Sequence, residues 1–181
     1  MNQRSSHTRL LSVLMMLAAA CAFTQAAAAQ GRGAAPAAPA APAPPNAPVP
    51  GPTFAEAQKA LSSSWAAADK MSVKVSCAIV DSRGDLIALG RMDGARFLTT
   101  DVARGKALTS AIYGQPSAAL TARGTNPATQ AFNEATVGRL RFIQGAVPII
   151  RGGFVVGAVG ASGASAQQDE QIATAGRGGL Q

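Results

Sequence analysis

The chain has a single histidine, His7, which stands close to the start of a sequence of 181 residues. Everything after residue 7 therefore lacks an imidazole, the usual general base for a serine or cysteine nucleophile. Ser-His-Asp and Cys-His catalysis are excluded from that part of the chain. A zinc ion would also lack its commonest protein ligand there, so we expect no metal site of that kind, and an iron porphyrin could not have a histidine ligand.

Aromatic residues are scarce, at 4% of the sequence, with one tryptophan and one tyrosine. The chain is basic, with sixteen Lys and Arg against nine Asp and Glu and a formal net charge of +7. These basic residues do not form a run. Because a nucleic-acid surface usually combines a basic stripe with stacking aromatics, we do not expect nucleic-acid binding.

No apolar run is long enough to cross a bilayer, so no transmembrane span is expected. Arg4 and Arg9 precede an apolar run over residues 10–23, shorter than the roughly 20 residues that a spanning helix needs. The small residues Ala27 and Ala29 follow. This pattern is typical of a removed export signal over residues 1–29 and predicts a periplasmic or extracellular protein.

Cysteine is equally rare, because only Cys21 and Cys77 are present. A lipid anchor on Cys21 is an alternative to cleavage after Ala29, although the preceding Leu-Ala-Ala-Ala is a weak lipoprotein signal. Cleavage after Ala29 would leave Cys77 alone, without an internal disulfide. We interpret Cys77 as core packing and not as a reactive thiol.

Residues 30–52 read "QGRGAAPAAPAAPAPPNAPVPGP" and are composed mainly of alanine and proline. Such a segment buries little apolar surface and favours an extended conformation. It is interpreted as a disordered linker. The folded domain is therefore expected over residues 53–181, which is long enough for one hydrophobic core.

The first half of this domain predicts a helix, a hairpin and a second helix. Thr53 and Glu56 form a capping box before an amphipathic helix over 54–70. The stretches 72–81 and 86–91 alternate as strands around the turn 82–85. Thr100 is expected to cap a helix over 101–114, one face of which carries the small residues Ala103, Ala107 and Ser110.

The second half predicts short helical pieces over 117–144, a second hairpin and a closing helix. The strands are 146–150 and 154–162, and Pro148 favours an edge position for the first of them. Ser165 and Gln168 form the capping box of the last helix. The order helix, hairpin, helix, hairpin, helix indicates an α+β domain with helices packed on an antiparallel sheet.

The segment "VVGAVGASGASAQQDE" resembles a phosphate-binding loop at first sight. A dinucleotide fingerprint, however, needs Gly-x-Gly-x-x-Gly at the first turn of a parallel unit. Here Gly157, Gly160 and Gly163 are spaced three apart, and the first two fall inside a strand. We interpret them as positions where another backbone approaches closely.

The charged residues that are candidates for a functional site lie around the first predicted hairpin and the second predicted helix. Lys106 shares a helix face with Val102, Thr109 and Tyr113. It is expected either to pair with a carboxylate of the hairpin, as an ordinary ion pair, or to receive an anionic ligand. The other charged members of the group are Asp81, Arg91, Asp93 and Asp101.

Three stretches in collinear order carry a family resemblance. "VSCAIVDSRGDLIALGRMDGA" resembles the signature hairpin of the GlcG/HbpS family of haem-binding or haem-degrading domains. "DVARGKALTSAIYGQPS" resembles the helix that follows it. "GAVPIIRGGFVVGAVGASGASAQQDEQIATAG" resembles the family's closing hairpin and helix, while residues 120–144 match poorly.

The resemblance implies an antiparallel sheet of about five strands, frequent homo-oligomers including octamers, and a haem or related tetrapyrrole as ligand. It places the family's shared polar positions at Arg91, Asp93, Lys106 and Thr109. Because no histidine is available, the axial ligand of a haem iron would have to be a hydroxyl group or one of four other side chains. The haem propionates would pair with basic residues. The thioether, phenol and thiol candidates are Met71, Met92, Tyr113 and Cys77, and the basic ones are Arg91, Arg96 and Lys106.

Three functions remain open. The first is an exported haem-binding domain that scavenges or degrades haem or senses redox stress. The second is a small hydrolase or isomerase of a catabolic pathway, with Lys106 as an electrostatic clamp and Asp81 or Asp93 as general base. The third is a structural homo-oligomer without a bound cofactor.

Overall fold

A computed structural model describes residues 50–180 of the chain. The expected export signal and nearly all of the expected linker lie outside the described residues. The described part contains four α-helices, four strands and one 3₁₀ segment in the order helix, hairpin, helices, hairpin, helix. The elements are α2 (Phe54–Lys70), β1 (Ser76–Asp81), β2 (Leu86–Arg91), α3 (Thr99–Tyr113), η1 (Ser117–Thr125), α4 (Pro127–Ala135), β3 (Ala146–Arg151), β4 (Phe154–Ser162) and α5 (Ala166–Gly178).

The strands form one antiparallel sheet in the order β2-β1-β4-β3. The α+β class with an antiparallel sheet is therefore confirmed, and the expectation of about five strands is corrected to four within the described residues. β1 pairs with β4 from Ser76 opposite Ser162 to Asp81 opposite Gly157. Pro148 lies in β3, the outer strand, as its missing N–H predicts.

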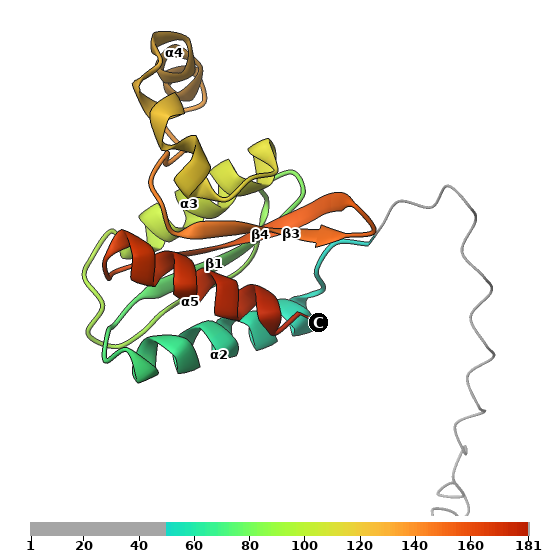
Figure 1. The fold of residues 1–181 in the computed structure, drawn as a ribbon, viewed down its shortest axis with the longest axis vertical. Coiled ribbons are helices and arrows are strands. Elements are labelled where there is room, and N and C mark those ends of the chain that lie inside the picture. Colours follow the sequence, from blue (N-terminus) through green and yellow to red (C-terminus); the bar gives the residue numbers. More distant parts are fainter. Residues whose placement is uncertain (1–49, 181) are drawn as a thin grey trace, which may run out of the picture. The chain divides into compact units, whose positions relative to one another are not determined.

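The helices cover both faces of the sheet (Figure 1). α3 crosses one face, while α2 and α5 lie side by side on the other. The main hydrophobic core lies between the sheet and the α2–α5 pair, and Cys77, Ile79 and Ile172 are fully buried in it. The position of Cys77 agrees with its interpretation as core packing. Burial raises the pKa of its thiol to about 12, so the thiol stays protonated at neutral pH.

The face under α3 is built almost entirely from alanine and glycine. Ala103 and Ala107 of α3 are fully buried against Ala78 and Ala158 of the sheet. A Cβ added to Gly160 would lie 2.8 Å from the backbone nitrogen of Ala107 and would also collide with the carbonyl of Ala103. The glycine of β4 therefore lets the backbone of α3 approach the sheet closely.

The other two glycines of the same motif also face backbone. A Cβ on Gly157 would collide with the carbonyl oxygen of Val80 in the neighbouring strand. A Cβ on Gly163 would lie 2.5 Å from the carbonyl oxygen of Lys74. The packing interpretation of this motif is confirmed.

Most of the expected boundaries are confirmed, with two corrections. The first strand begins at Ser76 and not at residue 72, because Ser72 has a left-handed φ of 54° and the Val73 N–H donates to Ala68 of the preceding helix. α3 begins after Leu98, which has a left-handed φ of 63° and makes no side-chain cap. Thr100 therefore lies inside the first turn and does not cap the helix.

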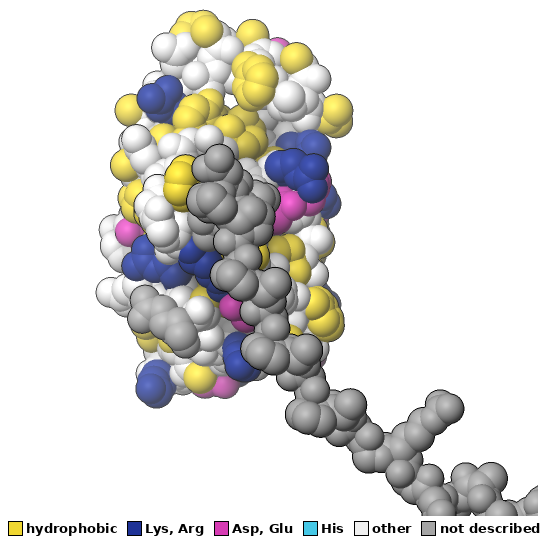
Figure 2. All heavy atoms as spheres, turned by 90° about the vertical axis from the view of Figure 1, so that its right-hand side faces the viewer, with side chains coloured by type: hydrophobic (Ala, Val, Ile, Leu, Met, Phe, Trp, Pro, Cys, Tyr) yellow, Lys and Arg dark blue, Asp and Glu magenta, His cyan; other side chains and the backbone are white. Residues whose placement is uncertain are grey.

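The segment after α3 contains short helices, as expected, and one of them stands apart from the sheet. α4 is capped by Asn126 but buries no residue, and Figure 1 shows it beyond α3. Hydrophobic side chains gather at that end of the face drawn in Figure 2, while Lys and Arg form several separate groups below. None of the helices in residues 50–180 is both long and apolar enough to cross a membrane.

Candidate ligand-binding site

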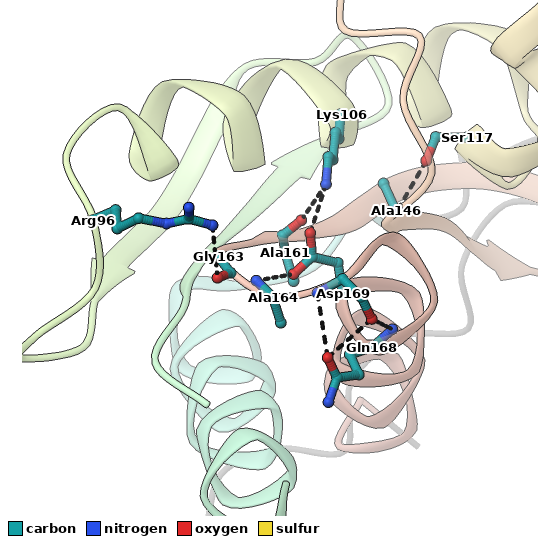
Figure 3. Close-up of polar contacts among 10 residues, drawn as sticks. Arg96, Lys106, Ser117, Ala146, Ala161, Gly163, Ala164, Gln168 and Asp169 are labelled. Carbon is teal, nitrogen blue, oxygen red and sulfur yellow. Dashed lines mark hydrogen bonds and ion pairs between the residues drawn. The ribbon is translucent and has the colours of Figure 1, made fainter. Parts of the chain in front are cut away.

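A buried ion pair between α3 and α5 forms the centre of the candidate site (Figure 3). Lys106 Nζ lies 2.8 Å from Asp169 Oδ2, and the two residues are only 2% and 3% exposed. The ammonium also donates to the carbonyl oxygen of Ala161 at 3.1 Å. An isolated buried charge would cost several kcal/mol, so each partner makes the burial of the other tolerable.

Local backbone geometry holds this pair in place. Gly145 has a φ of +134°, and a Cβ there would lie 2.6 Å from Lys106 Nζ and 2.8 Å from Asp169 Cβ. Any larger residue would therefore displace the pair. On the far side, the Ala164 N–H donates to Asp169 Oδ1 at 3.0 Å, which fixes the carboxylate at the start of α5.

The electrostatics favour the charged forms of both groups, because the ammonium of Lys106 and the carboxylate of Asp169 stabilise each other. Burial raises the pKa of Asp169, and the hydrogen bonds from Lys106 and from the Ala164 N–H oppose that rise. An ammonium has three protons to donate, and Asp169 and the Ala161 carbonyl accept two of them. The third proton has no acceptor among the residues that the structure describes, and Lys106 is one of the residues that line the adjacent cavity.

That cavity, which we call the lysine cavity, has a volume of about 530 Å³. Its size lies within the range of small-molecule sites. Its polar wall contains Lys106, Asp169 and Arg96. Its apolar wall consists of Phe97, Leu98, Val102, Ile143, Ala164 and Ala166.

The segment before α3 forms the mouth of the lysine cavity. Phe97 is 80% exposed and Leu98 is 56% exposed, so both present apolar surface to solvent beside the cavity. Arg96 Nη2 donates to the Gly163 carbonyl at 3.4 Å, which ties this segment to the end of β4. Thr99, also on the wall, donates to the Arg96 carbonyl at 2.6 Å.

Of the sequence-predicted site residues, Lys106 and Arg96 line this cavity. Arg91 is exposed on the outer strand β2, and its Nη1 lies 3.5 Å from the Ala95 carbonyl. Met92 packs against the main core from its edge, and Asp93 is exposed in the following turn. The structure therefore does not bring Arg91, Met92 or Asp93 to the wall of the lysine cavity.

The remaining predicted residues have structural contacts of their own. Thr109 is fully buried, donates to the Gly105 carbonyl at 2.7 Å and accepts from the Arg141 N–H at 2.9 Å. Tyr113 lies beneath the guanidinium of Arg123, whose Cζ is 5.1 Å from the ring centre. Neither residue lines the lysine cavity.

Asp81 lies far from Lys106, contrary to the hairpin ion pair that the sequence suggested as one outcome. Its Oδ1 accepts the N–H groups of Arg83 and Asp85 at 2.8 and 2.9 Å and so stabilises the hairpin turn. Asp81 also pairs with Gly157, at the opposite end of β4 from the cavity residue Ser162. The lysine cavity thus contains neither of the two carboxylates considered as general bases.

Comparison with known proteins places the domain in a family. The model of a family described as haem degrading protein HbpS-like matches residues 53–177. An uncharacterised 15.0 kDa protein from the dhaT-dhaS intergenic region of Citrobacter freundii is 30% identical over 123 residues, 67% of this chain and 86% of that protein. The chain belongs to the HbpS-like family.

Solved structures agree with the fold of an HbpS-like domain. A double mutant of Streptomyces reticuli HbpS is 31% identical, with a TM-score of 0.65 over 80% of this chain and 98% of that one. The PduOC:heme complex is 23% identical, with a TM-score of 0.64 over 71% of this chain and 94% of that one. At 23% identity the PduOC structure shows the fold alone, and the haem-related description comes from the family match.

The lysine cavity of this HbpS-like domain suits the ring of a tetrapyrrole better than its iron. The apolar side chains of the wall suit the macrocycle, and Arg96 suits a carboxylate substituent. The side chains considered as axial ligands lie elsewhere. Met71 and Met92 pack against the main core, Cys77 is buried in it, and Tyr113 lies beneath Arg123. Among the side chains that line the cavity, those that could approach iron are the hydroxyls of Thr99 and Ser162 and the two paired groups of Lys106 and Asp169.

Sequence reasoning missed Asp169 as the partner of Lys106, because the two residues are 63 positions apart. The cavity residues Phe97, Ile143 and Ala166 were also missed, because none of them belongs to a run of apolar residues with helix or strand spacing. One available signal was Phe97 next to Leu98, two large apolar residues between strands and helix.

Proposed function

We propose that this HbpS-like domain binds haem or a related tetrapyrrole in the lysine cavity, and that it holds the macrocycle and its carboxylates and not the iron. The observation that carries the proposal is a cavity of suitable size whose apolar wall adjoins Arg96 and the buried Lys106. Planar tetrapyrroles with carboxylate substituents combine the two properties that this wall would recognise.

The apolar contribution comes mainly from the mouth. Phe97 and Leu98 expose large side chains to water in the free domain, which is an unfavourable arrangement for a surface without a ligand. Covering an aromatic side chain removes apolar area from water at about 25 cal/mol per Å². A flat ring that lies against Phe97, Leu98 and Ile143 would gain this energy.

The polar contribution comes from Arg96 and Lys106. Arg96 is exposed and has a hydrogen bond only to a neutral carbonyl, so its guanidinium can still pair with a carboxylate. The third proton of Lys106 can donate to a ligand oxygen without separating the ammonium from Asp169. The ion pair thereby supplies a fixed donor in a site of low dielectric.

The relatives support a ligand of this class. The matched family is described by haem degradation, and the PduOC structure is a complex with heme. The absence of histidine from residues 50–180 is compatible with binding through the ring.

We also propose that the domain acts after export, on the basis of the signal-like pattern over residues 1–29. Mass spectrometry of the protein from its own cells should give an N-terminus near Gln30. A lipid-modified Cys21 at the N-terminus would favour the membrane-anchored alternative, and an intact Met1 would contradict export. Assembly into homo-oligomers, which the family resemblance implies, stays a prediction.

Hemin titration of the purified chain tests the ligand proposal. We expect a saturable shift of the Soret band with one hemin per chain. Phe97→Ala should weaken binding about tenfold or more, because burial of an aromatic side chain contributes about 1.5–3 kcal/mol. The matched control is Phe154→Ala, since Phe154 is 65% exposed at the β3–β4 hairpin and does not line the cavity.

Two results would contradict the proposal. An unchanged hemin spectrum at micromolar concentrations would show that this chain does not bind haem. Equal losses of affinity in Phe97→Ala and Phe154→Ala would show that hemin adheres to exposed apolar side chains without using the lysine cavity.

A further inference from the structure

A second cavity lies on the other side of α3's first turns. It has a volume of about 320 Å³, and we call it the arginine cavity because Arg104, Arg139 and Arg141 line it. Leu98, Val102 and Val137 supply apolar surface to the same wall. No function discussed above uses this cavity.

The arginine cavity is held together by close backbone packing. A Cβ added to Gly105 would lie 2.8 Å from the Arg139 carbonyl oxygen and would also collide with the side chain of Arg141. The Arg141 N–H donates to the Gly105 carbonyl and to Thr109 Oγ1, at 3.3 and 2.9 Å. The segment 139–141 is therefore fixed on α3, and Thr109 acts as the anchor.

Two strained residues stand at this cavity. Leu98 and Val137 have left-handed φ values of 63° and 62°, a conformation that is costly for bulky side chains and especially for a β-branched one. Val137 is 87% exposed, so packing within the described residues does not compensate for its strain. Such strain in a folded domain is commonly kept at ligand sites.

The charges of the cavity are unbalanced. Within residues 50–180, no carboxylate lies within ion-pair distance of Arg104, Arg139 or Arg141. The side chain of Arg141 is oriented by hydrogen bonds to the carbonyls of Gly138 and Leu140. Asp101 is the single carboxylate among the described residues that line the cavity, so the wall has an excess of positive charge.

We infer that the arginine cavity is a separate binding site for an organic polycarboxylate with an apolar body. A guanidinium group can bind a carboxylate through two parallel hydrogen bonds, and three arginines line this cavity. Leu98, Val102 and Val137 would cover the apolar part of such a ligand. The strained backbone at residues 98 and 137 presents two of these side chains to it.

This inference goes beyond the proposed function. The two cavities share Leu98 and Val102, but the arginine cavity contains neither Lys106 nor Asp169. Binding of a carboxylate ligand there does not require a tetrapyrrole in the lysine cavity. The test below contains no hemin, so failure of this site and failure of haem binding are seen separately.

Calorimetric titration of the full chain with benzene-1,3,5-tricarboxylate tests the site. We expect saturable binding at one site, weakened by added salt. Arg139→Gln should lower the affinity about tenfold or more, as expected for the loss of a charge-assisted hydrogen bond. Asp101→Asn should raise the affinity severalfold, because it removes a negative charge from the wall of the cavity.

The matched control is Arg83→Gln. Arg83 is 82% exposed in the β1–β2 turn, and this variant should bind within twofold of the wild type. Circular dichroism confirms that each variant is folded, and Arg104→Gln replaces Arg139→Gln if the latter is not. Absence of saturable binding, equal affinities of the Arg139 and Arg83 variants, or equal binding of inorganic phosphate would each overturn the inference.

Discussion

The lysine cavity and the arginine cavity share part of one wall, but they differ in the burial and pairing of their basic residues. In the lysine cavity, Lys106 is nearly inaccessible and is paired with Asp169 at 2.8 Å. In the arginine cavity, Arg104 and Arg139 are exposed and have no carboxylate partner among residues 50–180.

The difference separates a charge that the fold requires from charges that are free to act on a ligand. A buried ammonium without its carboxylate would be intolerable, so Lys106 and Asp169 must stay together whether or not a ligand is bound. An unpaired guanidinium group that is exposed to water costs little folding free energy, and its N–H donors remain available to an anion. Mutations in the two cavities should accordingly affect stability and binding in different proportions.

The largest effect is expected from Asp169→Ala. Removal of one partner leaves Lys106 buried and uncompensated, so the free energy of unfolding should fall by about 3–5 kcal/mol. Urea denaturation of the wild type and the variant measures this difference. Asp101→Ala is the matched control in the arginine cavity and should change the free energy of unfolding by no more than about 0.5 kcal/mol.

A loss in Asp169→Ala no larger than that in Asp101→Ala would contradict the comparison. It would mean that the buried ion pair contributes no more to the fold than an exposed carboxylate does.

Substitution of a glycine beside each cavity should disturb that cavity and leave the other one intact. Gly145→Ala forces a Cβ against Lys106 and Asp169, and Gly105→Ala forces one against the segment 139–141. Each should destabilise the domain by about 1–3 kcal/mol through overpacking. Gly145→Ala should weaken hemin binding selectively, and Gly105→Ala should weaken binding of benzene-1,3,5-tricarboxylate selectively.

Gly178→Ala is the control for these substitutions, because nothing lies within 4 Å of a Cβ at that position of α5. It should leave both affinities unchanged and should raise stability by up to about 1 kcal/mol, as expected for alanine in a helix. Equal effects of Gly145→Ala and Gly105→Ala on both ligands would show that the cavities are one site.

The core behind the lysine cavity should be sensitive to alkali. Burial raises the pKa of Cys77 from 9.0 to about 12, and the carboxylate of Asp169 adds to the rise. Between these values the unfolded chain loses the thiol proton while the folded domain keeps it. The free energy of unfolding should therefore fall by about 1.4 kcal/mol per pH unit over this window.

Cys77→Ala isolates that contribution, because it removes the thiol and keeps the other titrating groups. The difference between the wild-type and Cys77→Ala unfolding curves at pH 8, 10 and 11 measures the slope. Parallel curves for the two proteins would contradict a buried, protonated Cys77.

The smallest effect is expected from Val137→Asn in the arginine cavity. Asparagine adopts the left-handed conformation more easily than valine, so relief of strain should stabilise the domain by about 1 kcal/mol. The same change removes apolar surface from the cavity and should weaken binding of benzene-1,3,5-tricarboxylate. A loss of stability, measured by urea denaturation, would show that Val137 is packed and not strained.

Local patterns in the sequence predicted most of the elements but not how they meet. The capping residues Thr53 and Ser165, the two hairpins and the edge position of Pro148 all follow from short-range physics, and all are present. The spacing of Gly157 and Gly160 also predicted close backbone contact correctly. The strand count was taken from a family resemblance and was one too high.

The candidate site was harder to predict, because its partners are distant in the sequence. Lys106 was chosen for its neighbours on a helix face, but its carboxylate comes from a helix 63 positions later. Arg139 and Arg141 lie in a segment that neither periodicity nor family resemblance could place. Their approach to Gly105 depends on tertiary packing that no local pattern encodes.

The most direct test of the central claim compares hemin with metal-free protoporphyrin IX. If the lysine cavity holds the macrocycle and not the iron, the two dissociation constants of the wild-type protein should agree within about threefold, because an iron–ligand bond would contribute a large difference. Fluorescence quenching and Soret titration measure the two constants under identical conditions. A hemin affinity a hundredfold or more above that of protoporphyrin IX would contradict the account.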